Sequence, residues 1–174
     1  MPNNYFGGSI VGGAIRSFRA QSGLHPFRAM RHYFVGRAKM KTVLLLDDES
    51  MILKLLGSVL SGHYNVIGVE TAEQALRSFI EHHRVVDLLV ADLSLAKSSG
   101  ILVALLLRSI NPGLPIILTS GYPVSSWCER DAADLVRLGP RSVAIIEKPF
   151  LSQTLLKAVR DLTREPQTEL ARTA

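Results

Sequence analysis

Four short apolar segments, each followed by polar residues, constrain the fold of this chain more than any other feature. They are Thr42–Leu46 before Asp47-Asp48-Glu49, Val86–Ala91 before Asp92, Pro115–Thr119 before Ser120-Gly121, and Val143–Ile146 before Glu147-Lys148-Pro149. Segments this short, bounded by turn residues and alternating with helix-like stretches, are typical of buried strands in a parallel α/β sheet. Because ligands of such sheets bind beyond the carboxyl ends of the strands, the pattern predicts one pocket with three carboxylates, a hydroxyl and an ammonium group. This combination suits a divalent cation and a phosphoryl group.

Strands and helices are predicted to alternate from Lys41 onward. The expected strands are 42–46, 65–69, 86–91, 115–119 and 143–146, and the expected helices are about 50–61, 72–83, 99–110, 126–138 and 151–164. Turn residues support these boundaries, since Gly62 follows the first helix and Thr71 can cap the second with Gln74 at its capping-box position. Five β/α units with right-handed crossovers predict an α/β fold, a doubly wound parallel sheet with helices on both faces.

The basic charge of the chain is concentrated before Met40. Of the 20 lysines and arginines, six lie in residues 1–39, which contain no acidic residue. The 14 basic residues that remain stand against 15 acids, so the rest of the chain has a formal charge of −1. The basic character therefore belongs to the N-terminal segment and is weak evidence for nucleic-acid binding by the folded part.

Three parts are expected along the chain. Residues 1–39 form a basic extension that we expect to be disordered, residues 40–164 form one domain, and residues 165–174 form a flexible tail. Three interpretations of the extension stay open: an organelle transit peptide, a segment that binds an anionic surface, or sequence upstream of the natural product. The last is attractive because Met40 stands immediately before the first strand.

The composition favours a soluble cytoplasmic protein. Its hydrophobic content is 47%, but the longest apolar run, Ile101–Leu107, is far shorter than the roughly 20 residues of a membrane span. The single cysteine, Cys128, excludes an internal disulfide and fits a reducing compartment. We therefore expect no membrane span.

The order of the polar motifs resembles that of the receiver domains of bacterial two-component response regulators. The motifs that carry this resemblance are Asp47-Asp48, Asp92, Ser120 and Lys148-Pro149. The resemblance spans about residues 40–164 and implies a flavodoxin-like sheet with strand order 2-1-3-4-5. In that order the four strand ends lie side by side.

The resemblance implies that Asp92 accepts a phosphoryl group from a histidine kinase or a histidine phosphotransfer protein. Carboxylates are known covalent acceptors of this kind and form a reactive acyl phosphate. The cofactor implied is Mg²⁺, which offsets the repulsion between the acceptor and the incoming anion. Its protein ligands would be Asp47, Asp48, Asp92 and the backbone carbonyl of Ser94.

Further roles follow from the same resemblance. Ser120 and Lys148 would contact phosphoryl oxygens, and Pro149 would follow a cis peptide bond that directs Lys148 towards the site. Ser94 and Tyr122 occupy positions that control, in this family, how water reaches the phosphorylated aspartate. These two residues are therefore expected to tune the lifetime of the phosphorylated state.

The chain departs from the family pattern at several positions. Gly100 matches, but Ala96 stands where many receivers have proline, which predicts a less rigid loop. Ile145 replaces the aromatic residue that commonly rotates on activation, so that mechanism cannot simply be transferred. The segment 122–142 is longer than usual and predicts a lengthened approach to, or exit from, the fourth helix. Trp127 in this segment is expected either to contact a partner or to pack as an ordinary helix residue.

The function expected is that of a single-domain response regulator. It would signal by phosphorylation-dependent docking of a protein onto its fourth helix, last strand and last helix, and would catalyse only its own phosphotransfer and dephosphorylation. The alternative is a receiver-fold scaffold that works without phosphorylation. A haloacid-dehalogenase-like hydrolase would want Asp-x-Asp where this chain has Asp47-Asp48. A DNA-binding regulator would need a recognition domain, which we do not expect here unless the basic extension supplies one; the oligomeric state is left open.

Overall fold

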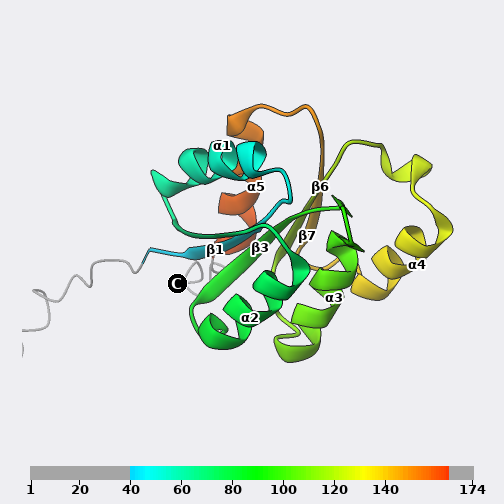
Figure 1. The fold of residues 1–174 in the computed structure, drawn as a ribbon, viewed down its shortest axis with the longest axis horizontal. Helices are drawn as coiled ribbons and strands as arrows, with labels where there is room; N and C mark the ends of the chain where they lie inside the picture. Colours follow the sequence, from blue (N-terminus) through cyan, green and yellow to red (C-terminus); the bar gives the residue numbers. More distant parts are fainter. Residues whose placement is uncertain (1–39, 165–174) are drawn as a thin grey trace, which may run out of the picture. The chain divides into compact units, whose positions relative to one another are not determined.

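The computed structural model describes residues 40–164, where five long strands alternate with five helices (Figure 1). The expectations for residues 1–39 and 165–174 lie outside the described residues. The elements are β1 (Thr42–Leu46), α1 (Ser50–Ser61), β2 (Asn65–Val69), α2 (Ala72–His82), β3 (Val86–Asp92), β4 (Ser94–Leu95), β5 (Ser98–Ser99), α3 (Gly100–Ile110), β6 (Ile116–Ser120), a 3₁₀ helix (Val124–Ser126), α4 (Glu129–Leu138), β7 (Val143–Glu147) and α5 (Ser152–Thr163).

The five long strands form one parallel sheet in the order β2-β1-β3-β6-β7. Because β6 and β7 are the fourth and fifth long strands of the chain, the predicted order 2-1-3-4-5 is confirmed. The register pairs Leu46 with Ala91 and Asp92 with Thr119, so β1, β3 and β6 end at the same edge. The polar residues that follow these strands therefore face one region.

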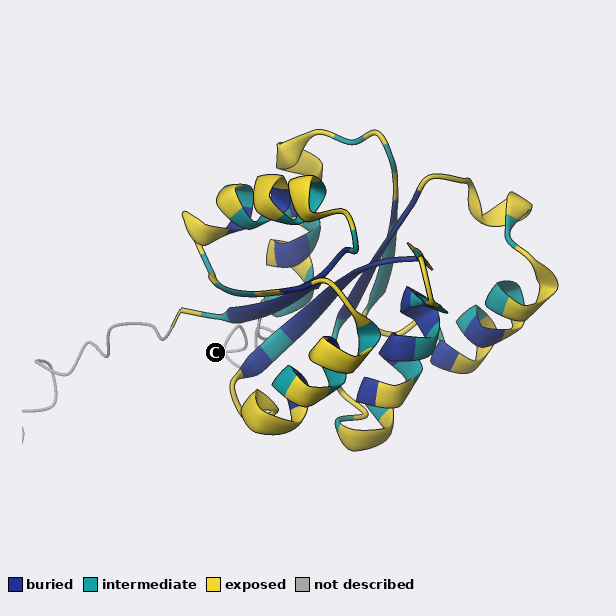
Figure 2. Cartoon of the chain, in the orientation of Figure 1, coloured by how far each residue is buried: buried dark blue, intermediate teal, exposed yellow. Residues whose placement is uncertain are grey.

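Two helix layers cover the sheet. Helices α1 and α5 pack on one face against alternate strand residues such as Val43 and Leu45, while α2, α3 and α4 pack on the other against Leu44 and Leu46. Figure 2 shows the central strands β1, β3 and β6 buried between the layers. Residues of β1 and most of β3 are buried on both faces, which explains their nearly continuous apolar sequence.

Two local features differ from the predicted elements. Residues 94–99 form an antiparallel hairpin, in which Ser94 pairs with Ser99. Helix α4 begins at Glu129 instead of 126, because the backbone of Trp127 and Cys128 is extended after the 3₁₀ helix. A 3₁₀ helix and an extended stretch thus lie between β6 and α4.

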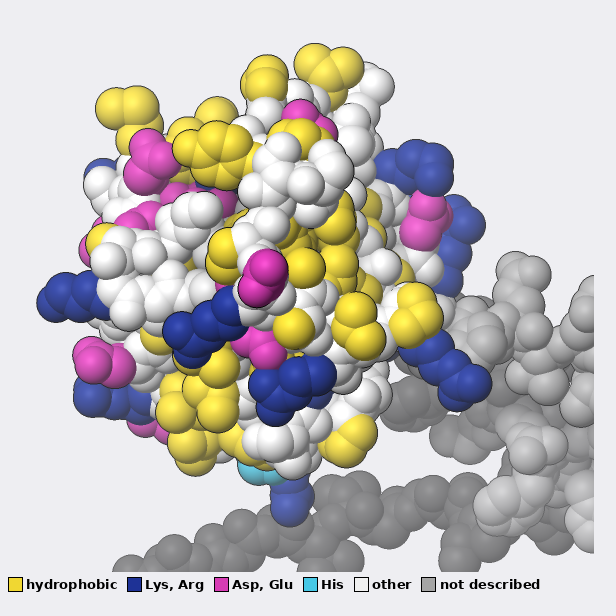
Figure 3. All heavy atoms as spheres, turned by 90° about the vertical axis from the view of Figure 1, so that its right-hand side faces the viewer, with side chains coloured by type: hydrophobic (Ala, Val, Ile, Leu, Met, Phe, Trp, Pro, Cys, Tyr) yellow, Lys and Arg dark blue, Asp and Glu magenta, His cyan; other side chains and the backbone are white. Residues whose placement is uncertain are grey.

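The α4 side of the domain exposes hydrophobic side chains between charged ones (Figure 3). Val136 on α4 is 80% exposed. Within residues 40–164, the structure contains no helix with the length and apolar character that crossing a membrane requires.

Candidate functional site

Three carboxylates meet at the carboxyl edge of the sheet, where the neighbouring strands β1 and β3 end. Asp47 and Asp48 directly follow β1, and Asp92 is the last residue of β3. The three acids can each offer one carboxylate oxygen such that these oxygens lie within 4.8 Å of one another. Asp47 and Asp92 are buried, whereas Asp48 is half-buried. The fold thus brings together residues that are up to 45 positions apart in the sequence.

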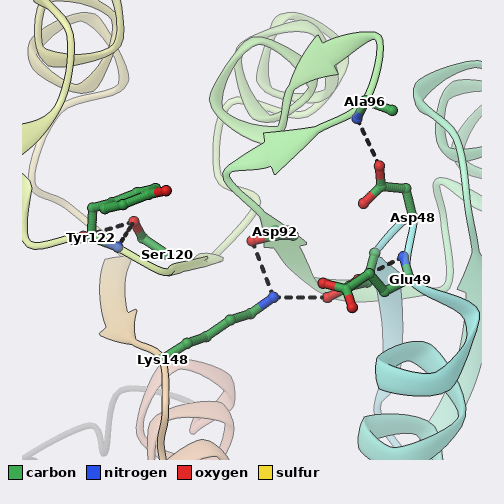
Figure 4. A network of polar contacts seen from close by, with 8 residues as sticks. Asp48, Glu49, Asp92, Ala96, Ser120, Tyr122 and Lys148 are labelled. Carbon is green, nitrogen blue, oxygen red and sulfur yellow. Dashed lines mark hydrogen bonds and ion pairs between the residues drawn. The ribbon is translucent and has the colours of Figure 1, made fainter.

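Lys148 reaches this cluster from the end of β7 (Figure 4). Its Nζ lies 3.1 Å from Oδ2 of Asp47 and 3.2 Å from Oδ1 of Asp92, so one ammonium group bridges two buried carboxylates. The backbone N–H of Lys148 donates to the carbonyl of Ser120 at 2.7 Å. The peptide bond between Lys148 and Pro149 is cis. Lys148 is therefore fixed to β6 by its backbone and to the acidic cluster by its side chain.

The electrostatics of the cluster favour additional positive charge. Burial raises the pKa of Asp92 above its ordinary value, and the nearby ammonium of Lys148 offsets this shift only in part. For Lys148, burial alone would lower the pKa, but the hydrogen bond to Asp47 and the charge of Asp92 outweigh it and raise the pKa. Lys148 is therefore held as a cation. A further cation nearby would stabilise the ionised form of the Asp92 carboxylate.

Ser120 lies at the same edge, but its hydroxyl is engaged by the next turn of the chain. Its Oγ donates to the carbonyl of Tyr122 at 2.7 Å and accepts from the Tyr122 N–H at 3.1 Å (Figure 4). The indole Nε1 of Trp127 donates to the same carbonyl at 3.2 Å. Within the described part of the chain, no hydrogen bond joins this hydroxyl to Asp92 or Lys148. Ser120 is buried, while Tyr122 is 64% exposed.

The β4–β5 hairpin adds a contact that sequence reasoning missed. Ser94, expected to act through its carbonyl, begins β4, and Ala96 and Lys97 form the turn of the hairpin. The N–H of Ala96 donates to Oδ2 of Asp48 at 2.7 Å. Two-residue strands have no periodicity to read, and a backbone donor has no side-chain signature. The only available signal was the absence of proline at position 96.

The donor set of the cluster fits magnesium. Mg²⁺ prefers a few hard oxygen ligands and retains several waters. Asp47, Asp48 and Asp92 provide three carboxylates in one small region, and the half-buried Asp48 leaves a side open to solvent. The raised pKa of Asp92 agrees with this fit, because a bound cation would favour its ionised form.

The sheet order and this edge define a class of protein: a flavodoxin-like α/β domain with an acidic pocket and a lysine at the ends of its central strands. The chain belongs to the response regulator receiver domain family, whose model matches residues 43–160. Receiver domains of this family act in two-component signalling, with phosphorylation and Mg²⁺ binding as general features.

Known proteins similar to the chain include two solved receiver structures. The response regulator receiver protein from Sinorhizobium medicae WSM419 is 29% identical, and the match covers 72% of this chain and 95% of that chain with a TM-score of 0.61. The signal receiver domain of an HD domain-containing protein from Pseudomonas fluorescens Pf-5 is 26% identical, with coverages of 71% and 94% and a TM-score of 0.61.

A curated relative is the transcriptional regulatory protein GlrR of Escherichia coli K12. It is 31% identical over 81 residues, which cover 46% of this chain and 18% of GlrR. The chain thus spans less than a fifth of the length of the curated relatives that it matches.

Proposed function

We propose that this receiver domain accepts a phosphoryl group on Asp92 from a histidine kinase or a histidine phosphotransfer protein. The observation that carries the proposal is the bridging position of Lys148 Nζ between Asp92 and Asp47. An oxygen of the Asp92 carboxylate would attack phosphorus while the bond from phosphorus to the donor breaks, which leaves an acyl phosphate on the protein. Lys148, held as a cation, would then pair with a phosphoryl oxygen.

The residues proposed to hold Mg²⁺ are Asp47, Asp48, Asp92 and the backbone carbonyl of Ser94. When bound, the ion offsets the repulsion between the acceptor and the phosphoryl group. Ser120 would exchange its hydrogen bond to the Tyr122 carbonyl for one to a phosphoryl oxygen. This exchange would release the segment that leads to α4. The effect of phosphorylation at Asp92 would thereby be transmitted to α4.

The output proposed is docking of a partner protein onto the face formed by α4, β7 and α5. Leu135, Val136, Val143 and Ile145 line a groove of about 450 Å³ on this face together with Gly139 and Pro140. The exposed Val136 gives the groove an apolar rim, which suits a protein partner. Hydrogen exchange compared before and after phosphorylation tests the proposal: α4 and β7 should change more than α1, and an unchanged α4 would argue against this face.

Intact-mass analysis after incubation with Mg²⁺ and acetyl phosphate tests the acceptor. The wild type should gain one phosphoryl group, and the gain should disappear with EDTA or in Asp92→Asn. Asp161→Asn is the matched control, because Asp161 is an exposed aspartate of α5 paired with Lys157. It should be phosphorylated like the wild type.

The alternative is a scaffold that uses the receiver fold without phosphorylation. If a control receiver gains a phosphoryl group under the same conditions and this chain gains none, the scaffold is favoured. Phosphorylation that persists in Asp92→Asn would instead reject Asp92 as the acceptor.

A further inference from the structure

The turn of the β4–β5 hairpin contacts the acidic cluster through a backbone group that has no role in the proposed phosphoryl transfer. The backbone N–H of Ala96 donates to Oδ2 of Asp48 at 2.7 Å (Figure 4). A hydrogen bond to an ionised carboxylate is about twice as strong as one between neutral groups. The contact is therefore a candidate for setting the orientation of the Asp48 side chain.

The hairpin leaves this N–H available. Its pairs are Ser94 with Ser99 and Leu95 with Ser98, and the N–H of Gly100 donates to the Leu93 carbonyl at 2.9 Å. Ala96 lies in the turn beyond the last of these pairs, so its N–H is not used by the hairpin. A proline at this position would have no N–H to donate.

Asp48 depends on this bond more than the other two acids depend on any single partner. Asp47 accepts from the Glu49 N–H at 3.0 Å and is paired with Lys148. Asp92 is also paired with Lys148 and is buried in its strand. Asp48 is half-buried, and across residues 40–164 its carboxylate has the Ala96 N–H as its one hydrogen-bond donor. Losing this donor would leave Asp48 free to turn towards solvent.

We propose that the Ala96 N–H is a positioning group for Asp48, which it holds in the pocket before Mg²⁺ binds. The inference rests on the proposed function, because it takes Asp48 as a ligand of the ion. A carboxylate ordered in the free protein loses less conformational freedom when it binds a metal. Groups that orient metal ligands typically contribute 10- to 100-fold to metal affinity. At Ala96 the hydrogen bond that orients the metal ligand thus comes from the backbone and not from a side chain.

Calorimetric titration of the full chain with Mg²⁺ tests this role in the wild type and two variants. Ala96→Pro removes the N–H and should weaken Mg²⁺ binding about tenfold. Ala96→Gly keeps the N–H, removes only the methyl group, and should bind Mg²⁺ almost as the wild type does. Equal or tighter binding by Ala96→Pro would overturn the inference, and so would a similar loss in both variants.

The Ala96 amide proton gives a second measurement, made without metal and without a proline. In the wild type its NMR signal should lie downfield, and Asp48→Ala should shift it upfield. An Ala96 amide chemical shift that is the same in Asp48→Ala as in the wild type would overturn the inference. The two proposals fail differently: no Mg²⁺ uptake by the wild type rejects the metal site and the inference with it, whereas normal uptake with unchanged affinity in Ala96→Pro rejects the inference alone.

Discussion

At the scale of single residues, Gly100 shows how closely the chain packs behind the acceptor. A Cβ at this position would overlap the carbonyl oxygen of Asp92 and lie 2.9 Å from its carbonyl carbon. Both atoms belong to the backbone of β3 and cannot move aside as a flexible side chain could. The glycine is thus required by the close approach of α3 to the acceptor strand.

Gly100→Ala should lower the free energy of unfolding by about 1–3 kcal/mol, the usual cost of overpacking. Gly57→Ala is the matched control, because Gly57 lies inside α1 and an added Cβ would meet no atom within 4 Å beyond its chain neighbours and the backbone of its own helix. That substitution should raise the free energy of unfolding by about 0.5–1 kcal/mol. Urea unfolding measures both changes. A higher free energy of unfolding for Gly100→Ala would show that the backbone of β3 can move to accommodate the added methyl group.

The charge of Asp92 should destabilise the metal-free domain at neutral pH. Burial raises its pKa, so the ionised form is less favourable in the folded chain than in the unfolded one. For an acid shifted in this direction, stability is lost as the pH rises from the ordinary pKa of 3.8 through the folded value.

Thermal unfolding in EDTA checks this effect. Asp92→Asn should melt above the wild type at pH 7, and the difference should shrink as the pH approaches 4. Asp161→Asn should show no gain, because the hydrogen bond from Lys157 lowers the pKa of Asp161. A lower melting temperature for Asp92→Asn at pH 7 would mean that the bridge to Lys148 outweighs the burial of the charge.

Tyr122→Ala should change the lifetime of the phosphorylated state. Both hydrogen bonds of the Ser120 hydroxyl join backbone atoms of Tyr122, so the substitution keeps them and removes only the exposed ring. With the ring gone, water should reach the aspartyl phosphate more easily. We expect faster dephosphorylation with little change in phosphorylation, measured with radiolabelled acetyl phosphate. Equal effects on both steps would contradict this role.

Sequence patterns located the acidic and basic side chains of the site because each stands at, or directly after, the end of an apolar strand. Asp92 and Lys148 are 56 positions apart, yet parallel pairing brings them to one edge. The engagement of the Ser120 hydroxyl by Tyr122 could not be predicted in this way, because it depends on the local path of the backbone after β6.

At the scale of elements, Arg108 holds four segments together. Its Nε donates to the carbonyl of Leu114 at 2.9 Å, ahead of β6, and its Nη1 donates to the carbonyl of Leu138 at 2.7 Å, at the end of α4. Nη2 donates to the carbonyls of Arg141 and Ser142 at 2.9 and 3.2 Å, ahead of β7. The side chain thus fixes the end of α4 and the start of β7 to α3.

Arg108→Ala should lower the free energy of unfolding by about 2–3 kcal/mol, because the part-buried carbonyl groups of Leu114 and Leu138 lose their donor. Arg108→Lys should fall between Ala and the wild type, since an ammonium group cannot reproduce the planar fork of donors. Urea unfolding measures the series. A loss below about 0.5 kcal/mol for Arg108→Ala, the range of ordinary surface substitutions, would show that the four carbonyls are satisfied by water.

A second contact joins the acceptor loop to α4. Ser99 Oγ donates to Oδ1 of Asp131 at 3.1 Å, and Cys128 Sγ donates to Oδ2 of the same residue at 3.3 Å. Ile145, where many receivers have a rotating aromatic residue, packs against the core between the sheet and helices α2 to α4. The chain therefore has a direct polar link between the end of β5 and the first turn of α4.

Apolar periodicity predicted the long elements well, because each strand or helix buries one continuous face or both. β1 and β2 begin and end at the predicted residues, and β6 is displaced by one residue. The 3₁₀ helix before α4 and the β4–β5 hairpin were not predicted, since segments of two or three residues bury too little apolar surface to leave a pattern.

At the scale of the whole molecule, the apolar core of residues 40–164 lies on both faces of the sheet. The two clusters of buried hydrophobic residues, with the side chains packed against them, extend from Val43 to Leu162. One cluster lies on each face of the sheet, and together they connect the sheet to all five helices. Residues 40–164 thus contain an apolar interior on both sides of every central strand.

A shortened chain of residues 40–164 should therefore fold cooperatively by itself. Its melting temperature should lie within about 4 °C of that of the full chain, the shift that roughly 1 kcal/mol produces in a protein of this size. Differential scanning calorimetry of the two chains makes the comparison. A larger loss would place part of the stabilising interface outside these residues.

The hydrogen bonds around Tyr122 also link the site to the fluorescence of a tryptophan. Trp127 is the only tryptophan in the chain, and its indole N–H shares the Tyr122 carbonyl with the hydroxyl of Ser120. Any rearrangement that detaches Ser120 from this carbonyl alters the polar environment of the single indole group. The tryptophan fluorescence of the unlabelled protein therefore comes from a residue only two hydrogen bonds away from Ser120.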